Sequence, residues 1–304
     1  MESTPSRRRR PRRRIVTGWV VAVALVAGSV TAGALLLQPG PAPTPVKAVA
    51  VAPRPSASPT VVPAPPKPTQ EQLAAVPLAF YDGLIPALLD STTVSPSNQW
   101  EVATPIAPLV ALYASPAPDA APIAALGSTV PTVNTATAVA VYGVSGEMIL
   151  VSTPSRNATP KPGKPAPSST FAWARAADFS ITKITQTVMV DNASSTISIV
   201  SSTGVVSASE IARLGTPDDP TPAATWSYIE SIYTDARVAY THGNPISLTG
   251  AHSSTLAGYG GNSALTALHF YPDPTGSSHG CVRVSASMTK SLAALPVGTP
   301  VIFG

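Results

Sequence analysis

The residues best suited to chemistry lie together near the end of the chain, in the run Ser278-His279-Gly280-Cys281-Val282-Arg283. A thiol becomes a strong nucleophile when a nearby imidazole or backbone amides favour its thiolate. Glycine before the thiol permits a tight turn in which backbone N–H groups point at a developing oxyanion. Arginine two residues later can hold a carboxylate through two parallel hydrogen bonds. These parts suit acyl transfer through a thioester, but spacing alone does not separate that chemistry from a metal site or a structural site.

Cys281 is the only cysteine in the 304 residues, so an internal disulfide is excluded. A single thiol is ordinarily a small buried apolar residue. The residues around Cys281 favour a reactive thiol instead.

A nucleophilic thiol needs a general base, and three histidines precede the run. His269 is the best candidate, because it ends the strand-like sequence Ala267-Leu268-His269 and lies nearest to the thiol. His242 and His252 remain alternatives. For each of them the competing interpretation is a hydrogen-bonded structural histidine.

The elements that would position these side chains are mainly β. Residues Thr187–Val190 and Thr196–Val200 alternate around a turn, and Pro300–Phe303 is a further strand. This pattern predicts an all-β sandwich, with one short helix over Ser285–Ala294 that begins at a Ser285 cap.

A second β-rich region precedes this one. Its predicted strands are Trp100–Pro105, Leu109–Tyr113, Ala138–Tyr142 and Met148–Val151. The Pro, Lys and Ser-rich stretch Arg156–Ser169 predicts a mobile loop. Residues Phe171–Phe179 resemble the last strand of bacterial Src-homology-3-like barrels, and an unrelated small β-domain is the alternative.

The start of the chain has the pattern of a targeting segment. Seven arginines between Arg7 and Arg14 precede an uncharged apolar run from Ile15 to Leu37, long enough to cross a bilayer with its N-terminal side in the cytoplasm. A cleaved signal peptide is the alternative. Without the seven arginines and Glu2, 12 basic and 14 acidic residues remain, so nothing predicts nucleic-acid binding. A Pro-rich spacer follows, and then a predicted short amphipathic helix within 70–90 that Pro77 and Pro86 interrupt.

The run around Cys281 resembles the signature of the L,D-transpeptidase catalytic domain, the bacterial cysteine enzymes that cross-link peptidoglycan. The resemblance extends from about Thr187 to Gly304. It also takes in Pro220-Thr221-Pro222, Leu248-Thr249-Gly250-Ala251-His252-Ser253, Gly260-Gly261 and Ala267-Leu268-His269.

The resemblance implies a role for each matching residue. Cys281 is the nucleophile, Gly280 and Cys281 supply the oxyanion-hole N–H groups, and His269 is the general base. His279 supports the site, while Arg283, with Ser278 and Phe270, binds substrate. The sequence departs from the family where Phe270 replaces the usual Gly and where the interval from His269 to Cys281 is short; His242, in contrast, is followed by a glycine.

What the family implies is cross-linking of third-position residues of peptidoglycan stem peptides in cell-wall biogenesis, without metal or cofactor, and inhibition by carbapenem-type β-lactams. The alternatives are an L,D-carboxypeptidase or protein–peptidoglycan hydrolase on the same scaffold, and an inactive wall-binding module. The catalytic part is expected outside a cell membrane that the chain crosses once, or secreted if the signal is cleaved. The expected organisation is a basic cytoplasmic tail (1–14), a transmembrane anchor (15–37), a Pro/Ala-rich linker (38–69), a linker with a short helix (70–97), a small β-domain (98–180) and the catalytic domain (181–304).

Overall fold

The computed structural model describes residues 61–304, apart from 132, 259, 260 and 274. The predicted basic tail and transmembrane anchor, and most of the Pro/Ala-rich linker, therefore lie outside the described residues. Among the residues described, no helix is both long enough and apolar enough to cross a membrane.

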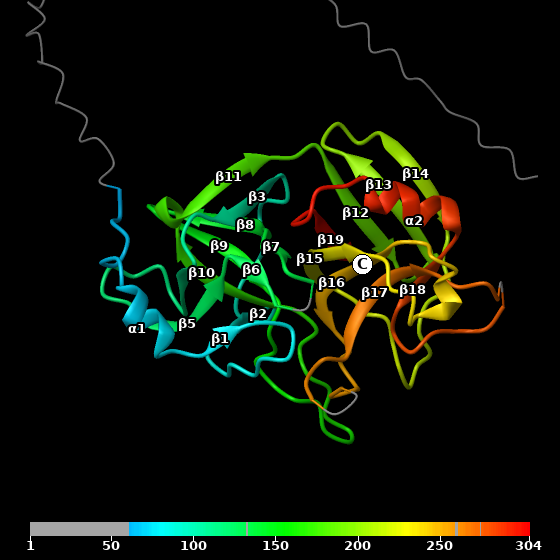
Figure 1. The fold of residues 1–304 in the computed structure, drawn as a ribbon, viewed down its shortest axis with the longest axis horizontal. Helices are drawn as coiled ribbons and strands as arrows, with labels where there is room; N and C mark the ends of the chain where they lie inside the picture. The colour runs from blue at the N-terminus through cyan, green and yellow to red at the C-terminus, as the bar shows by residue number, and fades with distance from the viewer. Residues whose placement is uncertain (1–60, 132, 259–260, 274) are drawn as a thin grey trace, which may run out of the picture. The chain divides into compact units, whose positions relative to one another are not determined.

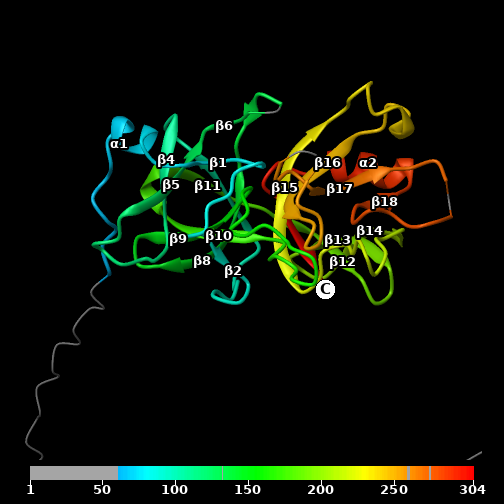
Figure 2. The same ribbon diagram turned by 90° about the horizontal axis from the view of Figure 1, so that it is seen from below.

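The prediction of a mainly β protein with few helices is confirmed. The described residues form two large sheets, whose strands appear in cyan to green and in green to red in Figures 1 and 2. The strands of the first sheet are β1 (Leu78–Ala79), β2 (Leu89–Asp90), β3 (Glu101–Pro105), β4 (Leu109–Tyr113), β5 (Pro122–Gly127), β8 (Val139–Ser145), β9 (Met148–Thr153), β10 (Thr170–Arg175) and β11 (Phe179–Lys183). Those of the second are β12 (Gln186–Asp191), β13 (Thr196–Ser201), β14 (Val206–Ile211), β15 (Thr225–Tyr233), β16 (Ile246–His252), β17 (Leu265–Phe270), β18 (Val282–Val284) and β19 (Pro300–Phe303). A small hairpin, β6 (Thr129–Val130) and β7 (Thr135–Ala136), and short 3₁₀ turns, η1 (Ala176–Asp178) and η2 (Ala239–Thr241), complete the strands and turns.

The first sheet runs in the order β1-β5-β4-β10-β9-β8-β3-β11, with β2 pairing to β10. It contains all four strands predicted between 98 and 153. Strands β1 and β2 also join it, from a stretch in which linker and a short helix were expected. The helix α1 is only Gln70–Ala74, capped by Thr69, because Pro77 cannot continue a helix and disfavours helical backbone just before it.

The second sheet runs in the order β14-β13-β12-β19-β15-β16-β17-β18. Strand β15 joins its two halves, because Thr225–Tyr228 pair with β19 while residues from Ile229 onward pair with β16. Apolar side chains from both halves meet in one core, as a sandwich requires. That core includes Val188, Ile199, Ile229, Leu268, Val282, Val301 and Phe303.

Local chemistry explains the predicted turn and helix in this part of the chain. Asp191 accepts hydrogen bonds from the backbone N–H groups of Ala193 and Ser194, which fixes the turn between β12 and β13. Helix α2 (Ala286–Ala293) begins where Ser285 Oγ accepts a hydrogen bond from the Met288 N–H. Met288 and Leu292 of α2 are buried in the core of the second sheet.

The stretch 156–169 is held by the second sheet's connections, contrary to the prediction of a mobile loop. The Ala166 N–H donates to the Ser254 carbonyl at 2.9 Å, and the His252 N–H donates to the Ser168 carbonyl at 2.7 Å. These backbone bonds join residues more than 80 positions apart in the sequence, so the composition of the stretch alone does not predict them.

Candidate active site

Two parallel strands bring the predicted base and the predicted nucleophile together. In the pairing of β17 with β18, His269 lies opposite Arg283, and Cys281 immediately precedes β18. The parallel register therefore carries two sequence segments to one end of the sheet. The position of His269 at the end of a buried strand agrees with the prediction.

A cavity of about 450 Å³ opens over this pair of strands. Cys281, His269, His279, Arg283 and Ser278 all line it. Most of the predicted site residues are thus gathered in one place. The remaining lining residues are Tyr240, Ser253, Leu256, Ala264, Leu265, Thr266 and Tyr271.

His269 is held in one tautomer by a backbone bond. Its Nδ1–H donates to the carbonyl of Phe270 at 2.8 Å, because a carbonyl oxygen can only accept. The lone pair is therefore on Nε2. Burial lowers the pKa of His269, which keeps the ring neutral and able to accept a proton at neutral pH.

Cys281 is a partly exposed residue whose sulfur is in a low-dielectric setting. Burial raises the pKa of its thiol, and the Ala267 N–H and the charge of Arg283 oppose that rise. The thiol therefore stays protonated at neutral pH. An acyl transfer from this state needs a base to take the proton as the sulfur attacks.

The turn before the thiol is closely packed. Gly280 has a φ of +94°, and a Cβ at that position would lie 3.2 Å from the Pro220 carbonyl oxygen. Ser278 Oγ donates to the carbonyl of Cys281, and the Ser278 N–H donates to the Leu214 carbonyl at 2.9 Å. Glycine is therefore required at 280 by both conformation and space.

The His279 imidazole makes a hydrogen bond that the sequence did not reveal. Its Nδ1–H donates to Asp219 Oδ2 at 2.8 Å, and the His279 side chain is 74% exposed. Asp219 is held in turn by Thr216, whose Oγ accepts from the Asp219 N–H at 3.1 Å. Neighbouring residues do not indicate this contact, because the partner of Asp219 lies 60 residues further along the chain.

Two arginines, Arg283 and Arg213, contact Tyr271 on one side of the cavity. The Arg283 guanidinium carbon lies 3.9 Å from the centroid of the Tyr271 ring, a cation–π contact. Arg213 donates to the Tyr271 carbonyl at 3.0 Å and pairs its backbone with that of Arg283. The ring centroid of Tyr240 lies 5.4 Å from the ring centroid of His269 and 5.4 Å from that of Tyr271. A carboxylate entering here would meet a positioned guanidinium.

The remaining candidates lie elsewhere. Phe270 does not line the cavity; its ring centroid lies 5.7 Å from that of His242, which is exposed and has a φ of +49°. His252 is buried, and its Nε2–H donates to the Pro154 carbonyl at 2.8 Å. Neither histidine lines the cavity that holds Cys281.

No group of three or more His, Cys, Asp or Glu side chains in the described part of the chain is arranged to hold a metal ion.

Residues 185–303 match the family model described as the L,D-transpeptidase catalytic domain, YkuD. No curated protein matches the sequence. Among solved structures, a mutant of the Enterococcus faecium L,D-transpeptidase is 20% identical, with 40% of this chain and 50% of that chain covered and a TM-score of 0.29. An L,D-transpeptidase from Stackebrandtia nassauensis is 22% identical, with coverages of 40% and 57% and a TM-score of 0.28. L,D-transpeptidase 3 from Mycobacterium tuberculosis, in complex with a faropenem-derived adduct, is 14% identical, with coverages of 55% and 90% and a TM-score of 0.31.

The chain spans about half the length of the first of these structures. Because all three TM-scores lie well below 0.5, we base the functional proposal on the family match and on the geometry of the cavity.

Proposed function

Since residues 185–303 match the L,D-transpeptidase catalytic domain, we propose that this protein is a peptidoglycan L,D-transpeptidase with Cys281 as its nucleophile. The observation that carries the proposal is the single cavity lined by the Cys281 thiol, the His269 imidazole and the Arg283 guanidinium. A wall-binding module has no need of a thiol beside a neutral, backbone-oriented imidazole.

The proposed reaction has two steps. In the first, Cys281 Sγ attacks the carbonyl carbon between the third residue of a stem peptide and a terminal D-alanine, while its proton passes to His269 Nε2. The oxyanion accepts from the N–H groups of Gly280 and Cys281. The C–N bond breaks, His269 returns the proton to the leaving amine, and a thioester remains on Cys281.

In the second step a side-chain amine of a neighbouring stem attacks the thioester. It loses a proton to His269, and the sulfur leaves and regains that proton as a thiol. The product is an amide between two third-position residues. Arg283, fixed over Tyr271, suits a carboxylate of the bound stem.

The proposed setting is the outer side of a membrane. The arginines before residue 15 and the uncharged run of 15–37 support an anchor with a cytoplasmic N-terminus. The Pro-rich residues after it would then act as a spacer toward the wall.

Incubation with a disaccharide-tetrapeptide followed by mass spectrometry tests the function. The transpeptidase yields a dimer that has lost one D-alanine, and Cys281→Ser yields none while keeping the parent's circular dichroism spectrum. A shortened monomer alone would assign the chain to hydrolases, since water would then resolve the thioester. No change in the substrate would contradict both activities.

A carbapenem supplies a second test. The LD transpeptidase LdtMt1 has been solved in complex with imipenem. We propose that imipenem likewise acylates this protein at Cys281, which intact-protein mass spectrometry detects as an adduct that Cys281→Ser does not form.

A further inference from the structure

Arg156 is a fully buried guanidinium whose partners are all backbone carbonyls. It follows β9 of the first sheet and has 0% exposure. Its Nε donates to the Asn262 carbonyl at 2.9 Å, Nη1 to that of Ser253 at 3.0 Å, and Nη2 to that of Leu256 at 2.6 Å. A charge taken out of water must be compensated by such bonds, so this geometry is specific rather than incidental.

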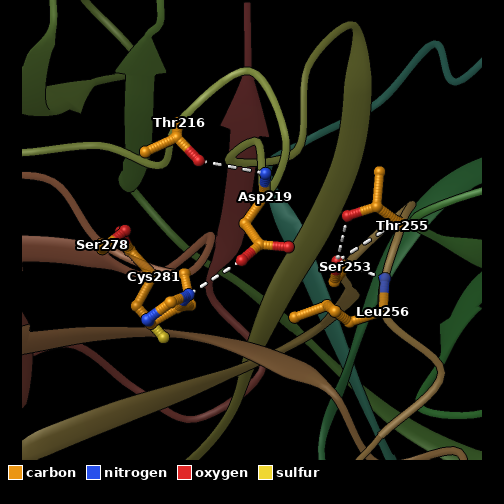
Figure 3. A network of polar contacts seen from close by, with 8 residues as sticks. Thr216, Asp219, Ser253, Thr255, Leu256, Ser278 and Cys281 are labelled. Carbon is orange, nitrogen blue, oxygen red and sulfur yellow. Dashed lines mark hydrogen bonds and ion pairs between the residues drawn. The ribbon is translucent and has the colours of Figure 1, made fainter.

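Two of those three carbonyls belong to the wall of the catalytic cavity. Ser253 and Leu256 line it together with Cys281. Ser253 Oγ accepts from the N–H groups of Thr255 and Leu256, at 3.2 and 3.0 Å, which closes a tight turn (Figure 3). The hydroxyl thus satisfies the N–H groups of the turn, while the guanidinium satisfies its carbonyls.

The arginine is itself held firmly. Its N–H donates to the Gly83 carbonyl at 2.9 Å, and its carbonyl accepts from the Ile85 N–H at 2.8 Å. Asp82, next to Gly83, accepts from the Asn262 N–H. The first sheet's connections therefore hold the Ser253–Leu256 wall of the cavity and, outside that wall, Asn262.

We propose that Arg156, supplied by the first sheet, is a positioning residue of the catalytic cavity: its bonds to the Ser253 and Leu256 carbonyls fix that wall and so determine which molecules reach and bind beside Cys281. The part of this inference that concerns acyl donors rests on the proposed function. The β-rich region before the catalytic domain then acts on the reaction, and is more than a spacer.

Arg156→Lys in the full-length protein tests this, because an ammonium keeps the charge but cannot reach three separate carbonyls with one planar fork. Arg175→Lys is the matched control: Arg175 lies on β10 of the same sheet, and its partners are Asp178 and the Pro65 carbonyl. Circular dichroism confirms that both variants are folded. Arg156→Gln keeps hydrogen-bond donors but has no charge, and its effect should lie between those of the parent and Arg156→Lys.

The first readout needs no transpeptidase activity, because Cys281 is the only thiol of the chain. We expect the alkylation rate with a bulky maleimide, relative to iodoacetamide, to change by about tenfold in Arg156→Lys, the effect of one lost charge-assisted bond on the wall. Arg175→Lys should keep the parent's ratio. An unchanged ratio in Arg156→Lys would overturn the inference.

The second readout is imipenem acylation resolved into a binding constant and a maximal rate. Arg156→Lys should weaken binding by about tenfold and leave the maximal rate within about twofold, because β17 and β18 are not touched. A loss confined to the maximal rate, or no loss, would contradict a positioning role at the wall. If the parent itself forms no adduct, the proposed function fails, and the alkylation ratio still decides the role of Arg156.

Discussion

Lowering the pH from 7 to 4 should destabilise the protein through His252, by an amount that follows from its surroundings. Burial lowers the pKa of His252 to about 4, and the nearby positive charge of Arg156 adds to this effect. The ordinary value is 6.5. At about 1.4 kcal/mol for each pKa unit, the difference corresponds to about 3 kcal/mol.

The sign follows from proton binding. Between pH 6.5 and about 4 the unfolded chain binds a proton at residue 252 that the folded protein does not. The contribution to the free energy of unfolding is therefore complete above pH 6.5 and is lost as the pH falls toward 4. Below that pH both states are protonated and the contribution stays flat.

His252→Gln isolates this effect. The glutamine amide can donate to the Pro154 carbonyl as Nε2–H does, but it does not titrate. Urea unfolding at pH 7, 5.5 and 4 should show the parent losing about 3 kcal/mol more than His252→Gln over this range. His242→Gln removes an exposed histidine and should follow the parent. Parallel losses in the parent and His252→Gln would refute the reasoning.

Four further outcomes are expected. Glu230 is buried with Oε2 unpaired, and burial raises its pKa to about 8. The stabilising contribution of its protonated form is therefore lost as pH rises from 4.5 toward 8. In urea unfolding, Glu230→Gln should stabilise the protein by a few kcal/mol more at pH 9 than at pH 4. His269→Ala should slow imipenem acylation by about 10²-fold, measured by timed intact mass, while His242→Ala should leave it unchanged. Acylation in the parent should fall with acidification at a midpoint below pH 6.5, because burial lowers the pKa of His269; a midpoint above 6.5 would contradict the neutral-base mechanism. Asp219→Asn should slow acylation by less than about tenfold, because the His279 side chain it pairs with is mostly in water; a loss as large as that of His269→Ala would show that the pair is essential.

The sequence was most informative where chemistry is concentrated in a short run. Neighbouring residues singled out Cys281 and Gly280 as candidates, and the end of an apolar strand singled out His269. The structure brings Cys281 and His269 to one cavity. The alternation of 187–190 and 196–200 predicted β12 and β13 because one face of each strand is buried. Local patterns of this kind depend on residues only a few positions apart.

Long-range partners were beyond such patterns. Arg156 stands at the start of a Pro, Lys and Ser-rich stretch that predicts a loop, yet its carbonyl partners lie about a hundred residues later. Asp219 likewise has its partner, His279, 60 residues later. His252 could be separated from His269 only when the fold buried it against Pro154. Tertiary packing creates these contacts of Arg156, Asp219 and His252, and a single sequence does not reveal it.

The place of β19 in the second sheet has a consequence for how the thiol becomes reactive. Residues Pro300–Phe303 lie between β12 and β15, and they bond to both. Until a growing chain includes Phe303, the half of the sheet that begins at β12 cannot join the half that carries β17 and β18. Contacts between residues so distant in sequence also form late, because closing a long loop costs entropy before any bond repays it. Assembly of the cavity therefore depends on β19, and a chain cut short before residue 300 would carry Cys281 without a finished site around it.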